Sequence, residues 1–118
     1  MVTSADRPAP AHPRLIHRPS GRIIPLPEHR NLVLLGKPNT HLPPDIDLSE
    51  FPEAAAVSRV HARILLVPPP PLLEDMGSTN GTYLNGQRLW PGERKPLTAG
   101  DAIALGSDQP VVFEFQSG

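Results

Sequence analysis

The chain has 118 residues, no cysteine, and 11 lysines and arginines against 12 aspartates and glutamates, which gives a formal net charge of -1. A chain of this length suits one domain with its own core, and the lack of cysteine excludes disulfide bonds and thiolate metal sites. The balanced charge argues against the broad positive surface that holds a nucleic-acid backbone, so any anion must be bound locally.

Residues 1–13 are rich in proline and alanine and show no hydrophobic periodicity. We expect them to form a flexible arm or the end of a linker, and residues 14–118 to form the domain. No apolar run approaches the roughly 20 residues that span a bilayer, and the N-terminus lacks the apolar region of a signal peptide. We therefore expect no membrane partner and a cytoplasmic location.

Proline is unusually frequent, at 17 of 118 residues, about three times its usual share of roughly 5%. Proline removes a backbone donor and interrupts helices, and the segments between prolines sustain no 3.6-residue hydrophobic period. The apolar runs are four to seven residues long, as in strands. The sequence therefore predicts an all-β fold.

The first two predicted strands are residues 14–17 and 22–26, which flank the turn signal Ser20-Gly21. Pro25 has no backbone N–H, so it favours an edge position for the second strand. We expect these two strands to form a hairpin.

The middle of the chain contains four more predicted strands. Residues 31–35 form one, and residues 45–48 form a short one within a stretch rich in proline and aspartate. Residues 62–67 and 72–75 flank four consecutive prolines. We expect these last two to pair across a stiff connection.

The C-terminal third contains the strongest hairpin signal, Asn85-Gly86, within residues 83–89. Residues 102–105 form a further strand before a turn at 106–108. The last strand, 111–116, alternates in polarity, so every second residue should face the core, namely Val111, Phe113 and Phe115. Many short strands separated by turns predict two packed sheets, a β-sandwich.

Two loop segments at strand ends carry the chemistry. Ser58-Arg59-Val60-His61 precedes the strand at 62–67, and Gly77-Ser78-Thr79-Asn80-Gly81-Thr82 follows the strand at 72–75. A serine hydroxyl can donate one hydrogen bond to a phosphate oxygen, and a guanidinium can donate two with charge assistance. The two glycines permit a positive φ, which lets the second segment converge as a tight turn. These residues indicate a binding site for a phosphate group.

These motifs resemble those of the forkhead-associated (FHA) domain, a module that recognises phosphothreonine peptides. The resemblance covers roughly residues 15–116 and rests on several separate segments in the family's order and spacing. They are Leu35-Gly36-Lys37-Pro38, 45–48, 57–62, 73–82, Leu84-Asn85-Gly86, 97–101 and 103–106. The resemblance implies a β-sandwich of about eleven strands with its recognition loops at one end.

By position, four residues resemble the family's phosphate-binding residues, namely Lys37, Ser58, Arg59 and Thr79. Asn80 resembles the residue that binds the peptide backbone. Other matched positions resemble residues that hold the loops, namely Gly36, His61, Gly77, Ser78, Gly81, Asn85 and Gly86. The family usually has an arginine in place of Lys37. Lysine keeps the charge but not the bidentate geometry, which predicts weaker or more forgiving phosphate binding.

The resemblance implies a partner that contains phosphothreonine, a preference for threonine over serine through a pocket for the γ-methyl group, and no cofactor or metal. A residue beyond the phosphothreonine usually tunes selectivity in the family, and here the loop at 53–56 would contact it. The nearby acidic residues indicate that basic flanking residues are favoured; they are Asp45, Asp47, Glu50 and Glu53.

Two other function classes have to be weighed. A protein-interaction scaffold of the same fold could bind its partner through a sheet face, without phosphate. Ser58 and His61 could belong to a hydrolase triad, but no Gly-x-Ser-x-Gly segment accompanies them, and we expect no enzymatic activity. The other histidines lack metal-ligand spacing, and we expect surface or loop positions for His12, His17, His29 and His41.

Overall fold

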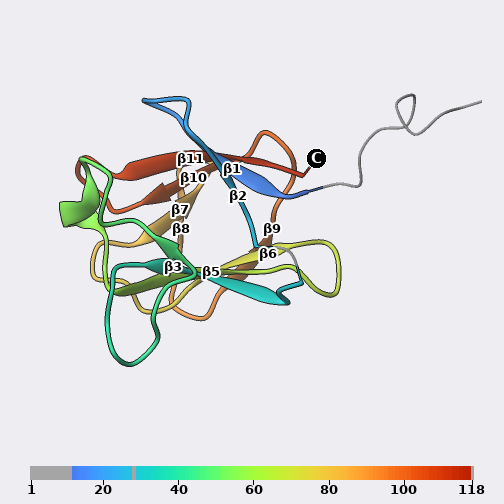
Figure 1. Cartoon of the computed structure of the whole chain (residues 1–118), viewed down its shortest axis with the longest axis horizontal. Coiled ribbons are helices and arrows are strands. Elements are labelled where there is room, and N and C mark those ends of the chain that lie inside the picture. The colour runs from blue at the N-terminus through green and yellow to red at the C-terminus, as the bar shows by residue number, and fades with distance from the viewer. Residues whose placement is uncertain (1–11, 28, 118) are drawn as a thin grey trace, which may run out of the picture.

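The computed structural model describes residues 12–27 and 29–117 and contains two facing β-sheets (Figure 1). One sheet has six strands in the order β2 (Ile23–Pro25), β1 (Arg14–His17), β11 (Val111–Gln116), β10 (Ala102–Leu105), β7 (Thr82–Leu84) and β8 (Gln87–Leu89). The other has five strands in the order β4 (Ile46–Asp47), β3 (Leu32–Gly36), β5 (Val60–Leu65), β6 (Leu72–Asp75) and β9 (Arg94–Pro96). The predicted all-β sandwich is therefore confirmed.

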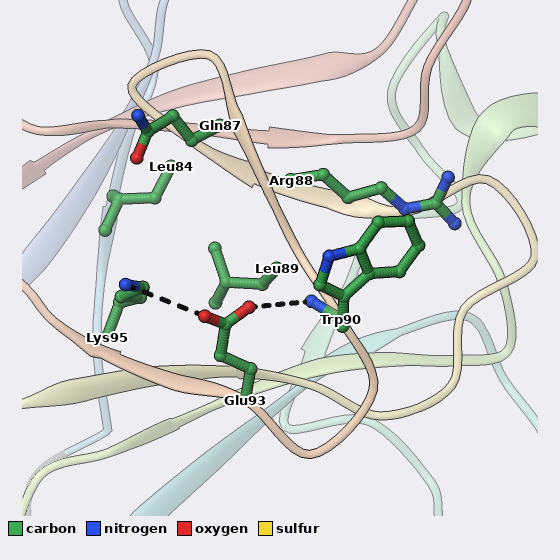
Figure 2. A pocket seen from close by; sticks show the side chains of 7 residues that line it. All are labelled: Leu84, Gln87, Arg88, Leu89, Trp90, Glu93 and Lys95. Atoms are coloured by element: carbon green, nitrogen blue, oxygen red, sulfur yellow. Dashed lines mark hydrogen bonds and ion pairs between the residues drawn. The ribbon is translucent and has the colours of Figure 1, made fainter.

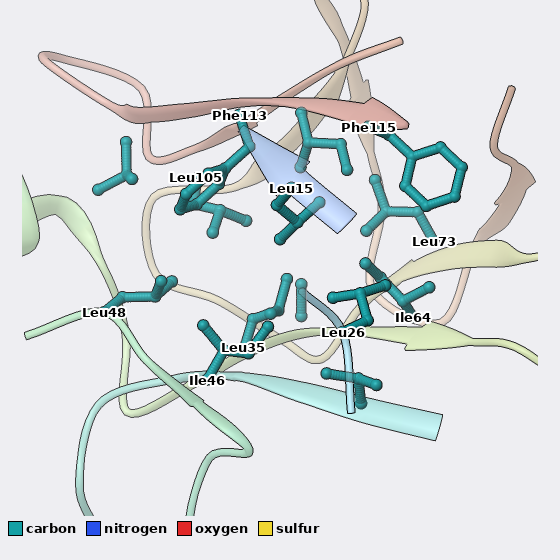
Figure 3. Packing of buried hydrophobic residues seen from close by; sticks show 14 of the residues in the cluster. Leu15, Leu26, Leu35, Ile46, Leu48, Ile64, Leu73, Leu105, Phe113 and Phe115 are labelled. Carbon is teal, nitrogen blue, oxygen red and sulfur yellow. The ribbon is translucent and has the colours of Figure 1, made fainter. Parts of the chain in front are cut away.

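The core lies between the two sheets, where apolar side chains from both inner faces meet (Figure 3). In β11 the burial alternates, and Val111, Phe113 and Phe115 are fully buried as predicted. Burial of each such phenylalanine stabilises the fold by about 1.5–3 kcal/mol. Leu15 on β1 and Ile64 on β5 are also fully buried, so both sheets depend on this shared core.

Two predicted turns form as expected. Asn85 and Gly86 both have positive φ, 50° and 84°, and they connect β7 to β8. This combination is typical of the type I′ turn that the Asn-Gly pair favours. Strands β1 and β2 pair around Gly21. Strand β2 lies at the edge of its sheet, a position that tolerates Pro25, which has no backbone N–H.

Strand β5 begins and ends two residues before the predicted 62–67. Its first residue, Val60, pairs with Gly36 across an irregularity in the register, so the strand includes His61. The strand ends at Leu65, before the proline run, because consecutive prolines offer no backbone N–H for a ladder. The predicted pairing across the prolines, between β5 and β6, is confirmed.

Strand β9 was not predicted, because its three residues are all exposed and show no alternation. It pairs with β6, where Arg94 Nε and Arg63 Nε donate to Glu74 Oε1 at 2.9 Å and 3.0 Å. Burial alone would raise the pKa of Glu74, but the two guanidinium groups outweigh it and hold this pKa below its ordinary value. An ion pair between strands therefore helps to hold β9 against β6, and a hydrophobic pattern in the sequence could not reveal such a contact.

The prediction that His17 lies on the surface or in a loop is wrong. His17 ends β1, whose burial alternates so that Leu15 and His17 point inward, and it is 2% exposed. The residue's position in a short alternating strand fixed its direction, whatever its polarity.

The loops that follow β3, precede β5, and connect β6 to β7 and β10 to β11 meet at one end of the sandwich, which we call the loop end (Figure 1, left). The loop before β5 contains a short 3-10 helix, η2 (Ala54–Ala56), which was not predicted. Within residues 12–27 and 29–117, no helix has the length and apolar character needed to cross a membrane. The predicted arm at residues 1–13 lies almost wholly outside the described part of the chain.

Candidate functional site

An open hollow of about 430 Å³ lies at the loop end. Its walls come from three separate loops and contain every residue that the sequence predicted to bind phosphate or peptide; they are Lys37, Ala55, Val57, Ser58, Arg59, Thr79 and Asn80. No carboxylate is among them, while two are cations. The fold therefore brings residues far apart in sequence into one positively charged hollow.

Ser58 and Thr79 connect two of these loops. The Thr79 backbone N–H donates to Ser58 Oγ at 3.0 Å, and the Ser58 hydroxyl hydrogen has no acceptor among the described residues. The exposed Thr79 hydroxyl likewise has no partner in the part of the chain that the structure describes. Both hydroxyls can therefore donate to a bound group.

The two cations of the hollow differ in how they are held. Lys37 Nζ donates to the Ala54 carbonyl at 3.1 Å, which leaves two ammonium hydrogens for a ligand. Arg59 is exposed, and its guanidinium has no carboxylate partner within the described ranges. Its backbone carbonyl accepts from Lys37 N at 2.9 Å and from Asn39 Nδ2 at 3.4 Å. A fixed ammonium and a free guanidinium thus face the same space.

The His61 ring connects the loop before β5 to the β6–β7 loop by two hydrogen bonds. Its Nδ1 accepts from the Ser58 backbone N–H at 3.0 Å, so in the neutral ring Nε2 carries the hydrogen and donates to the Gly81 carbonyl at 2.8 Å. Burial lowers the pKa of His61; the Gly81 carbonyl and Asp75 oppose this effect, and Lys37 adds to it. The ring is therefore kept neutral, and neither nitrogen is positioned as a base for the Ser58 hydroxyl.

Asp75, at the end of β6, holds the following turn. Its Oδ2 accepts from the backbone N–H groups of Gly77 and Ser78 at 2.9 Å and 3.2 Å, and its Oδ1 accepts from the hydroxyls of Ser78 and Thr82. Ser78 Oγ in turn accepts from Gly81 N at 3.0 Å. The roles of Asp75 and Thr82 were missed, although an aspartate two residues before Gly-Ser is a recognisable Asx-turn signal.

Two glycines allow close contacts beneath the hollow. A Cβ at Gly36 would lie 1.9 Å from the Arg59 carbonyl oxygen, and a Cβ at Gly106 would lie 2.5 Å from Ala56 Cβ. Gly106 N also donates to the Gly81 carbonyl at 2.9 Å. The part of Gly106 in the site was missed, because nothing in the sequence indicates that the β10–β11 loop contacts η2.

Asn80 joins this hollow to a second one. Its Nδ2 donates to the Ala56 carbonyl at 3.2 Å, while its Oδ1 has no partner among the described residues. The second hollow, of about 310 Å³, shares Asn80 and Ala55 with the first and is lined by Pro52, Glu53, Ala55, Ala56, Asn80, Ser107, Asp108 and Gln109. It contains two carboxylates and no cation, so a positive and a negative hollow lie side by side.

The predicted Asn85-Gly86 turn lies at the far end of β7 from Gly81. Asn85 Oδ1 accepts from Ala102 N at 2.9 Å, and its Nδ2 donates to Asp101 Oδ1 at 3.0 Å. The turn is therefore held against the start of β10 and does not line the hollow.

A further hollow of about 210 Å³ lies between β8 and β9 and contains none of the predicted site residues (Figure 2). Trp90 is 62% exposed there, and the Arg88 guanidinium carbon lies 4.8 Å from the centroid of its ring. Glu93 is already engaged by Trp90 N at 3.0 Å and by Lys95 Nζ at 3.6 Å. The ionisable groups that line this hollow thus largely have partners within the chain.

Comparison with known proteins places this geometry in a family. The FHA domain family model matches residues 33–106. Protein FraH of Nostoc sp. is 47% identical over 103 residues, which is 87% of this chain but only 36% of that protein. The chain therefore spans about a third of the length of this curated relative.

Solved structures give the same result. The N-terminal FHA domain of S. cerevisiae Rad53p, in complex with a phosphothreonine peptide, has a TM-score of 0.73 and 25% identity, and the match covers 91% of this chain and 94% of that one. Mycobacterium tuberculosis EmbR, in complex with a low-affinity phosphopeptide, has a TM-score of 0.73 and 27% identity, and the match covers 99% of this chain and 27% of that one. Both relatives were solved with a phosphorylated peptide bound.

Proposed function

The chain belongs to the FHA domain family, and from this we propose that it is a phosphopeptide-binding adaptor module that recognises phosphothreonine in a partner protein. The observation that carries the proposal is the set of unpaired donors around one hollow without a carboxylate, contributed by Lys37, Ser58, Arg59 and Thr79. A phosphothreonine brings a charge of about -1.5 to -2 and three acceptor oxygens. The number of free donors and the positive charge of the hollow therefore match the acceptor oxygens and the negative charge of a phosphothreonine.

Each donor has a distinct part in this proposal. The hydroxyls of Ser58 and Thr79 donate one hydrogen bond each to phosphate oxygens, and the Arg59 guanidinium donates two with charge assistance. Lys37 acts as a point charge whose position is fixed by the Ala54 carbonyl. Because these groups are exposed or half-buried, binding should weaken as salt concentration rises.

Asn80 is proposed to bind the peptide backbone. One amide hydrogen is occupied by the Ala56 carbonyl, and the free Oδ1 can accept from a peptide N–H. The side chains of Ala55 and Val57 supply apolar surface in the same hollow, which suits the γ-methyl group of threonine better than the bare Cβ of serine.

The second hollow is proposed to accept a flanking residue of the peptide. Glu53 and Asp108 line it, and Asp108 has no ion-pair partner within the described part of the chain. A basic side chain would be favoured there by charge complementarity. A peptide array that showed preference for acidic flanking residues would overturn this assignment.

A scaffold that binds its partner without phosphate is the main alternative function. It would not require the donors of the hollow, and its partner would bind equally with and without the phosphate. We propose no catalytic role, because His61 is engaged by two backbone groups and is not directed at the Ser58 hydroxyl. The domain boundary at residue 14 and a cytoplasmic location remain predictions from the sequence.

An oriented phosphothreonine peptide library, followed by calorimetric titration of the selected peptide, tests the proposal. We expect binding of the phosphothreonine form, at least tenfold weaker binding of the phosphoserine form, and no measurable binding of the unmodified peptide. Equal affinity for modified and unmodified peptides would favour the scaffold. Thr98→Ala provides a matched control, because Thr98 is exposed on the segment between β9 and β10, outside both hollows.

A further inference from the structure

A buried histidine and a half-buried glutamate connect the six-stranded sheet to the segment that contains η2. The His17 ring packs 4.5 Å from the ring of Phe51 and 5.8 Å from that of Phe113, and its Nδ1 lies 2.7 Å from Ser20 Oγ. Its Nε2 faces Glu53 Oε2 at 3.5 Å. These two facing atoms are both buried, and neither has a hydrogen-bond partner among the described residues.

Buried polar atoms without partners are uncommon, because each one costs free energy. A hydrogen on Nε2 directed at Glu53 would satisfy both atoms, and protonation of the ring would in addition turn the contact into an ion pair. Histidine is the side chain that gains charge between about pH 5 and 8. The pair is therefore arranged so that one proton changes its strength.

The other charged groups around the pair are already engaged. On the segment before η2, Glu50 is paired with Arg22 at 2.7 Å, and this arginine also lies over the Phe51 ring at 5.4 Å. On β11, Glu114 is paired with Arg18 at 3.6 Å. Within residues 12–27 and 29–117, Glu53 is the carboxylate that lies within 4.0 Å of the His17 ring.

The position of Glu53 bears directly on the first hollow. Glu53 immediately precedes η2, whose Ala54 carbonyl accepts from Lys37 Nζ and whose Ala56 carbonyl accepts from Asn80 Nδ2. Movement of η2 relative to the sheet would therefore displace two proposed ligand-binding side chains together.

We propose that His17 is a positioning residue for the binding site. In its protonated form it pairs with Glu53, holds η2 against the six-stranded sheet, and strengthens phosphopeptide binding through Lys37 and Asn80. The binding part of this inference rests on the proposed function, whereas the link between His17 and η2 does not.

The first experiment needs no ligand. Chemical shifts of the His17 ring and of the Ala54, Ala55 and Ala56 amides are followed by NMR in the full chain between about pH 5 and 8. We expect the amide shifts to follow the His17 ring shifts in the wild type and in the control Glu50→Gln. In Glu53→Gln the amide shifts should no longer follow those of the ring. Amide shifts that still follow the ring in Glu53→Gln would overturn the proposal.

The second experiment measures affinity for an alanine-flanked phosphothreonine peptide over the same pH range. The ratio of wild-type to Glu53→Gln affinity cancels the titration of the phosphate itself and of His61. It should rise about two- to fivefold in favour of the wild type as pH falls, as for a partly exposed ion pair, and His17→Gln should behave like Glu53→Gln. A ratio independent of pH would refute the binding part. If no peptide binds, the proposed function fails and the NMR result alone decides the link.

Discussion

The backbone N–H of Thr79 donates to the hydroxyl oxygen of Ser58 across 3.0 Å, although the two residues are 21 positions apart in the chain. This contact uses the acceptor side of the serine and leaves its hydrogen free to donate outward. One side chain therefore both joins two loops and presents a donor to the hollow between them. The contact also shows that the two motifs share one end of the sandwich, as the resemblance to the FHA domain required.

Replacement Ser58→Ala should weaken phosphopeptide binding by about 1.5–3 kcal/mol, roughly 10- to 100-fold in Kd, because it removes a hydrogen bond to a charged group. It also removes the acceptor of Thr79 N, so Thr79 should become more mobile. Calorimetry of the variant beside Thr98→Ala checks the effect. A Kd equal to that of the wild type would remove Ser58 from the site.

Replacement Lys37→Ala should weaken binding by about 1 kcal/mol, roughly fivefold, because one cation of the hollow is lost. Lys37→Arg should bind at least as tightly as the wild type, since a guanidinium adds a second parallel donor. The salt dependence of Kd should become shallower in Lys37→Ala and stay unchanged in the control Lys95→Ala. Unaltered affinity of Lys37→Ala would mean that Lys37 is only a surface lysine.

Replacement Gly36→Ala should be destabilising at the upper end of the range of roughly 1–3 kcal/mol for overpacking, because its Cβ would lie 1.9 Å from the Arg59 carbonyl oxygen. Relief of this clash would move Arg59, so phosphopeptide affinity should fall as well. Gly21→Ala is the control, because its Cβ meets no atom within 4 Å and only its φ of +73° is unfavourable. Chemical denaturation measures the loss of stability. Calorimetry should show loss of affinity in Gly36→Ala alone.

Replacement Asp75→Asn should lower the free energy of unfolding by about 1–3 kcal/mol. The new amide N–H would face a group that now donates a hydrogen bond to the carboxylate, so two donors would face each other. All four groups around Asp75 are donors in the present arrangement, so neither orientation of the new side chain satisfies them. Asp108→Asn, on the exposed β10–β11 loop, should be nearly neutral. Equal stability of both variants would contradict the role of Asp75.

The lowered pKa of His61 predicts acid sensitivity. The unfolded chain, with the ordinary histidine value of 6.5, binds the proton more readily than the folded chain does. The contribution of His61 to stability is therefore complete above that value and is lost as pH falls towards the folded-state pKa. His61→Gln should be less stable at neutral pH, and its difference from the wild type should shrink on acidification. Denaturation at a series of pH values checks this, and a constant difference would contradict it.

Much of the fold could be predicted from the sequence, because local signals and tertiary packing agree in most strands. Residues 111–116 alternate in polarity and form β11 with the expected residues inside. Asn85-Gly86 demands positive φ at both positions and receives it. Strand β9 was not predicted, because an ion pair with Glu74 rather than a hydrophobic pattern helps to hold it in place. Helix η2 was not predicted, because three alanines show no hydrophobic period.

The members of the candidate site could also be predicted, since Lys37, Ser58, Arg59, Thr79 and Asn80 all line one hollow. Several of their supports were predicted too, namely Gly36, His61, Gly77, Ser78 and Gly81, whereas the roles of Asp75, Thr82 and Gly106 were not. The four donors around Asp75 and the contact between Gly106 and Ala56 depend on how distant loops fold against one another. The inward direction of His17 was mistaken because polarity was given more weight than strand alternation.

The Gly81 carbonyl accepts from His61 and from Gly106 at once, so its loop has little conformational entropy left to lose on association. A guest should then dock almost as onto a rigid body, with only a modest change in heat capacity. Partners of different strength should accordingly arrive at similar rates and differ mainly in how long they stay.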